Sequence, residues 1–159
     1  MEYDSDQVPS LFKSIKWRAM TVNLDMGGGA REDATLYLSE KGVKNLVFDP
    51  NTRSDEHNDD VITWVMRIGG SHSVTLANVL NLIPTWKDRD AILYYSKFLA
   101  RSNAPIYIGV CEGDKSGRGR LTNAGWQANL KLSEYKNAVA NRFRITAVTD
   151  SMITAVKDV

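Results

Sequence analysis

The run Asp25-Met26-Gly27-Gly28-Gly29 has the composition of a tight turn that brings bare backbone close to a ligand. Glycine has no Cβ, so Gly27 and Gly29 can adopt turn conformations that are closed to other residues, and no side chain blocks the approach. Asp49-Pro50 lies about 20 residues further along the chain. A carboxylate at that distance from a glycine turn typically accepts hydrogen bonds from the hydroxyls of an unphosphorylated ribose. The spacing therefore predicts a ligand that contains a nucleoside.

The elements around these residues must bring them to one edge of a sheet. Residues 19–24 (AMTVNL) have the composition of a buried strand, and residues 30–41 have the apolar spacing of a helix. Residues 44–48 form a second expected strand, which ends at Asp49. Because ligands of open α/β sheets bind outside the carboxyl ends of the strands, this unit places Asp49 beside the glycine turn. The N-terminus of the helix adds unpaired N–H groups there.

The remaining chain continues the alternation of strands and helices. We expect helices over 10–18, 61–68 and 86–100, and a further helix after an N-cap at Ser133. We expect strands over 73–79, 106–111, 144–148 and 152–156. Loops are expected over 51–60 and 112–130. Alternating strands and helices predict a mostly parallel sheet with helices on both faces. The last two strands predict a C-terminal antiparallel hairpin at one edge. The expected fold is a single α/β, Rossmann-like domain over 20–159, preceded by an N-terminal helical lead-in over 1–19.

Composition narrows the classes of function. The chain has 159 residues, 43% of them hydrophobic, which suits one domain with a sizeable core. Its net charge of +1 gives no general field for nucleic acid, so such a partner would need a local patch. We expect no disulfide framework, because the chain has one cysteine, Cys111. We expect no metal site, because the two histidines, His57 and His72, lie far apart in the sequence. Without a long apolar run we expect a cytoplasmic protein and no membrane partner.

The glycine turn and its acid resemble the first two motifs of the Rossmann-like, class I S-adenosylmethionine-dependent methyltransferases. The first motif of that family is roughly D-x-G-x-G-x-G, and Asp25, Gly27 and Gly29 match it, with Arg31 in place of the third glycine. Asp49 matches the acid that closes the second strand in the family. The resemblance implies that the cofactor is S-adenosylmethionine, with Asp25 near its methionine amino group and Asp49 on its ribose. Gly28 and Pro50 complete this part of the expected site.

A further stretch, Thr75 to Ile83, resembles the fourth-strand motif of a small methyltransferase subgroup found in phages and beside DNA-modification systems. Its pattern there is like N-x-V-L-N-V-I. The resemblance implies that Asn78, Val79 and Asn81 shape the methyl-donor end of the site, and that the protein comes from a phage or mobile element and acts in the host cytoplasm. The alternative for Asn78 is a hydrogen bond that only closes the end of its strand.

The acceptor of the methyl group is expected to be a nucleic acid or a small molecule. No Asn/Asp-Pro-Pro-Tyr/Phe signature follows Val79 and no Pro-Cys nucleophile is present, since Cys111 falls in an expected strand, so DNA adenine-N6 and cytosine-C5 methylation are disfavoured. Methyl transfer needs mainly in-line positioning, and no catalytic residue is assigned. Arg118 and Arg120, among glycines, suit an anionic acceptor, and Trp126 suits a stacked ring. A solvated loop and a tryptophan docked on the core are the alternatives.

Two other functions use the same features. A binding-only protein would keep the cofactor pocket without transferring a methyl group, either as a cofactor sink or as a module that docks on a host protein. A protein for NAD or a nucleotide sugar would use the same turn and ribose acid, although the chain has no room for a separate substrate domain. Asp59 and Asp60 either cap a helix or contact adenine.

Overall fold

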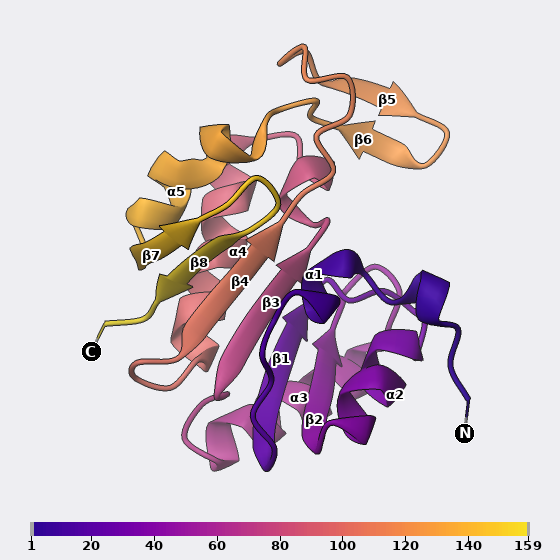
Figure 1. Ribbon diagram of the computed structural model, residues 1–159, viewed down its shortest axis with the longest axis vertical. Helices are drawn as coiled ribbons and strands as arrows, with labels where there is room; N and C mark the ends of the chain where they lie inside the picture. Colours follow the sequence, from indigo (N-terminus) through magenta and orange to yellow (C-terminus); the bar gives the residue numbers. More distant parts are fainter. Residues whose placement is uncertain (1, 159) are drawn as a thin grey trace.

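The computed structural model describes residues 2–158 and contains a central six-stranded sheet in the order β2-β1-β3-β4-β8-β7 (Figure 1). Its strands are β1 (Thr21–Met26), β2 (Val43–Phe48), β3 (Ser73–Ala77), β4 (Pro105–Gly109), β7 (Arg144–Val148) and β8 (Ile153–Val156). The helices are α1 (Ser10–Lys13), α2 (Asp33–Glu40), α3 (Asp55–Arg67), α4 (Trp86–Leu99) and α5 (Lys136–Ala140). The first four strands are parallel, and β8 and β7 add the antiparallel hairpin. The expected fold class is confirmed.

Helices cover both faces of the sheet (Figure 1). On one face, α3, α4 and α5 pack on the main core, in which Leu24, Leu76 and Ile106 are fully buried. On the other face, α2 and the N-terminal segment form a smaller cluster around Phe12 and Leu38. The strands β1, β3 and β4 are therefore covered on both sides, as expected for a parallel sheet.

Several predicted boundaries were wrong near the N-terminus. The expected helix over 10–18 is only the short α1, because the chain turns after Lys13 so that Trp17 can stack on Phe12 at a centroid distance of 5.9 Å. The first strand ends at Met26 rather than at residue 24, so Asp25 lies inside it. The helix predicted over 30–41 begins only at Asp33.

The region between β2 and β3 was also predicted incorrectly. Only residues 51–54 of the loop predicted over 51–60 are a loop, because α3 begins at Asp55 with the Ser54 hydroxyl accepting from the His57 N–H at 3.1 Å. Asp59 and Asp60 therefore lie exposed within the helix and do not cap it. The segment has few apolar residues because one of its buried positions is polar, namely Asn58.

Three corrections apply to the C-terminal half. Strand β4 ends at Gly109, which leaves Cys111 exposed rather than buried in a strand. The connection over 112–130 contains a small antiparallel hairpin of β5 (Arg120–Thr122) and β6 (Gly125–Gln127). Ser133 lies inside a 3-10 helix, η3 (Leu132–Tyr135), and the capping role belongs to Lys131 and Glu134.

Residues 1 and 159, the outer bounds of the two expected segments, lie outside the described residues. Among residues 2–158, no helix combines the length and the apolar character that crossing a membrane requires.

Candidate functional site

The glycine turn lies at the carboxyl end of β1 and is fixed by backbone contacts. The Gly27 N–H donates to the Phe48 carbonyl at 2.7 Å, which ties the turn to the end of β2. Gly27 and Gly29 both have positive φ, 72° and 78°, and this favours glycine at each position. At Gly28 the reason is space, because a Cβ there would lie 2.5 Å from Asp25 Oδ2. Gly28 therefore packs directly on the buried acid.

Asp49 reaches back from the end of β2 to this turn. Its Oδ2 accepts from the Gly29 N–H at 2.9 Å, and its Oδ1 accepts from the Asn51 N–H at the same distance. Asn58, on α3, bonds both the N–H and the carbonyl of Asp49. The carboxylate is thus held in one orientation, and each oxygen keeps a further acceptor position. Pro50 is exposed beside it, at the start of the turn toward α3.

Asp25 is the most unusual ionisable group of the site. The residue is 2% exposed, and its two carboxyl oxygens accept from Thr75 Oγ1 at 3.1 Å and Asn45 Nδ2 at 3.4 Å. Burial raises the pKa of Asp25 to about 6, although both hydrogen bonds and the charge of Arg53 lower it. The group therefore changes protonation close to neutral pH.

A cavity of about 170 Å³ opens directly on the turn. Asp25, Gly27–Arg31 and Ala77 form its wall on the sheet side, and Gln7, Pro9 and Phe12 of the N-terminal segment form the opposite wall. Asp25 and the backbone of the turn therefore line one cavity. The N-terminal segment is part of the site, and the sequence pattern gave no sign of this.

The residues predicted after β3 divide between two places. The Val79 side chain is buried and packs against Gly27, where a Cβ would lie 2.8 Å from Val79 Cγ2. Asn78 is exposed with φ 57°, and its N–H donates to the Gly109 carbonyl at 2.9 Å, which closes the strand end. It lines a second cavity of about 220 Å³, between the N-terminal segment and the ends of β3 and β4. Val79 thus joins the glycine turn, whereas Asn78 does not.

Asn81 joins neither cavity. It is 1% exposed in a short 3-10 helix, η2 (Leu80–Leu82), and among the described residues neither its Oδ1 nor its Nδ2 has a hydrogen-bond partner. Its carbonyl accepts from the Ala128 N–H at 2.9 Å, next to β6. A buried amide whose two polar ends have no described partner is energetically costly.

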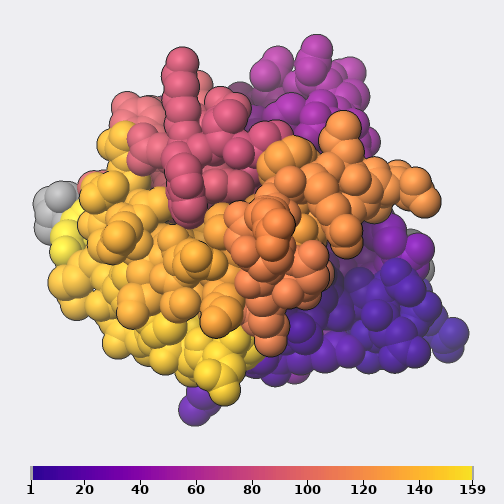
Figure 2. All heavy atoms as spheres, turned by 90° about the horizontal axis from the view of Figure 1, so that it is seen from above, coloured from indigo at the N-terminus to yellow at the C-terminus, as the bar shows by residue number. Residues whose placement is uncertain are grey.

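The basic hairpin stands above this position at the carboxyl edge of the sheet. Figure 2 looks down on that edge and shows the 112–130 segment, in orange, projecting next to the indigo N-terminal segment. Arg118 and Arg120 are exposed, and Trp126 is half-buried under Gly119, where a Cβ would lie 2.1 Å from Trp126 Cζ2. Trp126 therefore packs within its own hairpin, and no described group accepts from its buried Nε1.

Sequence reasoning missed Asn45, Thr75 and Arg53. The first two bond Asp25, and the Arg53 Nε donates to the Gly29 carbonyl at 2.8 Å while its Nη1 pairs with Glu32. A polar residue in the middle of an otherwise apolar strand was the available signal for Asn45 and Thr75. Arg53 had no such signal, because its contact depends on how the chain turns between β2 and α3.

Comparison with known proteins shows a shared fold. No family model and no curated protein matches the chain. Among solved structures, it is similar to the 1,6-didemethyltoxoflavin-N1-methyltransferase of Burkholderia thailandensis, determined with bound 1,6-didemethyltoxoflavin and S-adenosylhomocysteine. The identity is 19%, the TM-score is 0.66, and the match covers 89% of this chain and 72% of that chain. A SAM-dependent methyltransferase from Methanosarcina mazei has 13% identity, a TM-score of 0.67 and coverage of 90% and 95%. The fold is thus that of the class I methyltransferases.

Proposed function

We propose that this chain binds S-adenosylmethionine at the glycine turn and transfers its methyl group to an acceptor. The observation that supports this most strongly is the pairing of the turn with two buried acids. Asp25 lies under Gly28, and Asp49 is bonded to the Gly29 N–H. This arrangement is expected for a site that binds the cationic methionine part and the ribose of the cofactor at the carboxyl ends of two neighbouring strands.

The residues of the site fit each part of the cofactor. Asp25, once ionised, is the acceptor for the methionine ammonium group, and the cavity in front of it is bounded by bare glycine backbone. The acceptor positions that remain on Asp49 suit the two ribose hydroxyls. An unphosphorylated ribose suits this acid, because a 2′-phosphate would be repelled by the carboxylate.

The part of the site that would bind the methyl acceptor lies at the same edge of the sheet. S-adenosylmethionine supplies an already activated methyl group, so the chain has to position the acceptor and exclude water. The basic hairpin, with the exposed side chains of Arg118 and Arg120, stands over η2 at the carboxyl edge of the sheet. These features support an anionic acceptor, either a nucleic acid or a small molecule. The more specific assignment to a phage or DNA-modification subgroup depends on the Asn78-Val79-Asn81 pattern alone, and a site in the host cytoplasm depends on that assignment.

The direct test is calorimetric titration with S-adenosylmethionine, S-adenosylhomocysteine and NAD. We expect the two adenosyl compounds to bind and Asp49→Ala to weaken them by about 1–3 kcal/mol, because the ribose hydroxyls and the Gly29 N–H lose their partner. Asp158→Ala removes an exposed carboxylate at the other end of the chain and serves as the matched control. The proposal would be overturned if the folded protein bound neither adenosyl compound, or if it bound NAD more tightly than both.

A second measurement separates the cofactor from the acceptor side. The double variant Arg118→Ala, Arg120→Ala should keep its affinity for S-adenosylhomocysteine, because neither side chain lines the cavity at the glycine turn. Its rate of methyl transfer from labelled S-adenosylmethionine into cell extract should fall. Cofactor binding without any transfer by the unmodified protein would favour the binding-only function, and loss of cofactor affinity in the double variant would place the hairpin in the cofactor site.

A further inference from the structure

A third cavity, separate from those at the glycine turn and at Asn78, lies at the opposite end of the sheet from the glycine turn. Its volume is about 370 Å³, and Thr21, Ser73 and Pro105, the first residues of β1, β3 and β4, form part of its wall. We call it the amino-end cavity. Strand β1 has six residues, so roughly 20 Å of strand separates this cavity from the glycine turn. The two sites therefore cannot share a small ligand.

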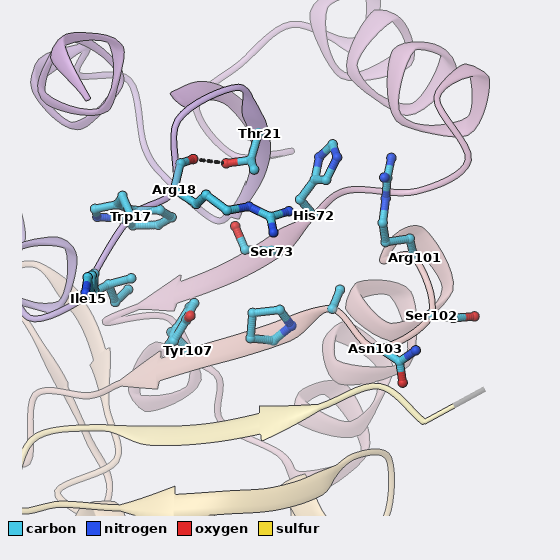
Figure 3. A pocket seen from close by; sticks show the side chains of 13 residues that line it. Ile15, Trp17, Arg18, Thr21, His72, Ser73, Arg101, Ser102, Asn103 and Tyr107 are labelled. Carbon is cyan, nitrogen blue, oxygen red and sulfur yellow. Dashed lines mark hydrogen bonds between the residues drawn. The ribbon is translucent and has the colours of Figure 1, made fainter. Parts of the chain in front are cut away.

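Cationic and imidazole groups gather at one end of the amino-end cavity. Figure 3 shows the imidazole of His72 between the side chains of Arg18 and Arg101. Among the described residues, no carboxylate lines the cavity or forms an ion pair with either arginine. Burial, followed by the charges of Arg101 and Arg18, lowers the pKa of His72. The positive charge of this cluster is thus uncompensated, which is the condition for binding an anion.

Hydrogen bonds hold these groups in place and leave donors available. The Val22 N–H donates to His72 Nδ1 at 3.0 Å, so the neutral imidazole carries its proton on Nε2. Arg101 donates through Nε to the Gly70 carbonyl and through Nη2 to the Ile68 carbonyl, which fixes the side chain and leaves Nη1 unused. The Arg18 backbone is fixed by Thr21 Oγ1, which donates to its carbonyl at 2.6 Å, and its guanidinium has no hydrogen bond to a described residue.

The other end of the cavity is aromatic. Trp17 and Tyr107 lie there with their ring centroids 6.2 Å apart, and Figure 3 shows Arg18 extending from this pair toward His72. Trp17 is anchored by its Nε1, which donates to the Phe12 carbonyl at 2.9 Å. An anion site joined to an aromatic wall suits a ligand with a phosphate at one end and a flat ring at the other.

We propose that the amino-end cavity binds a nucleoside monophosphate, with its phosphate on Arg18, His72 and Arg101 and its base against Trp17 and Tyr107. The volume of about 370 Å³ is within the range of pockets that enclose small ligands. This inference does not depend on the proposed methyl transfer, because its residues and those of the glycine turn are at opposite ends of the strands.

The test is calorimetric titration of the full chain with uridine 5′-monophosphate, inorganic phosphate and uridine at one fixed ionic strength. We expect the nucleotide to bind more tightly than either fragment. Arg18→Gln should weaken it about tenfold or more, since a charge-assisted contact to phosphate is lost. This side chain is exposed and bonds no described residue, so the variant should fold. Lys136→Gln, which removes one exposed cation elsewhere, should change the affinity less than about twofold.

Uridine monophosphate also contains a ribose, which Asp49 at the glycine turn could bind. Asp49→Ala tests for this, and it should leave the affinity for uridine monophosphate unchanged if the nucleotide binds in the amino-end cavity. Four results would overturn the proposal: no binding of the nucleotide, equal losses in Arg18→Gln and Lys136→Gln, loss of binding in Asp49→Ala, or inorganic phosphate binding as tightly as the nucleotide.

Discussion

The two faces of β1 differ in chemistry although both are buried. Leu24 and Met26 belong to the main core under α3 and α4, and the buried Val22 is on the same face of the strand by alternation. The alternate residues Asn23 and Asp25 point to the opposite face, where a chain of hydrogen bonds crosses the sheet. A strand that is covered on both sides therefore does not have to be apolar on both sides.

The polar face forms a continuous network. Ser73 Oγ donates to Asn23 Oδ1 at 2.8 Å, Asn23 Nδ2 donates to Asn45 Oδ1 and Thr75 Oγ1, and these two residues donate to Asp25. Ser73 also lines the amino-end cavity, so the network extends from that cavity to the glycine turn. The apolar face stabilises the sheet, whereas the polar face orients a buried acid. We expect substitutions on the two faces to affect different properties.

The largest effect on stability should come from the apolar face. Leu24→Ala should lower the free energy of unfolding by roughly 4 kcal/mol, because the side chain is fully buried and its removal leaves a cavity in a close-packed core. Denaturant unfolding followed by circular dichroism measures the change. Leu24→Met, which nearly keeps the volume, is the control and should cost less than about 1.5 kcal/mol. A loss in Leu24→Ala as small as that of the control would mean that this face is loosely packed.

The next largest effect should be a pH dependence on the polar face. Asp25 has a folded-state pKa of about 6, above its ordinary value of 3.8, so the folded protein binds this proton more tightly than the unfolded chain. Its stabilising effect is complete below pH 4 and is lost as the pH rises through 6, for a total of about 3 kcal/mol. The groups that act on the pKa of Asp25 are Asn45, Thr75, Arg53 and Asp49, and all four are unchanged in the variant described next.

Asp25→Asn isolates that contribution. The difference in unfolding free energy between the unmodified protein and Asp25→Asn should move in favour of the variant between pH 4 and pH 8, because the amide is uncharged throughout. Carboxylates with lowered pKa values, such as Asp33 and Asp90, lose stability at low pH in both proteins and cancel in the difference. A difference that does not vary with pH would mean that Asp25 is ionised as easily as in the unfolded chain.

Local pattern was sufficient for the glycine turn and for Asp49, because a strand followed by glycines and a second strand ending in an acid fix both positions through parallel pairing. Local pattern did not predict the features that depend on tertiary contacts.

The start of α3 at Asp55 was not predicted, because the helix buries Asn58, a polar residue that bonds the backbone of Asp49. The N-terminal segment was expected as a longer helix, and its role as a wall of the cavity depends on Phe12 packing beside Ala77. Asn45 and Thr75 acquire their role only from their neighbours across the sheet.

The smallest effect should come from a buried hydroxyl of the main core, on which the apolar face of β1 packs. The Tyr135 hydroxyl is fully buried in the main core, beside the ring-stacked guanidinium of Arg89, and no described group bonds it. Tyr135→Phe should therefore change the unfolding free energy by less than about 1 kcal/mol, and in the stabilising direction, since an unsatisfied hydroxyl is removed. Tyr3→Phe is the contrast, because that exposed hydroxyl donates to Glu40 and its loss should destabilise slightly. Destabilisation by Tyr135→Phe beyond 1 kcal/mol, a limit of about twice the error of denaturant unfolding, would show that the hydroxyl has a partner and that the apolar face is not uniformly apolar.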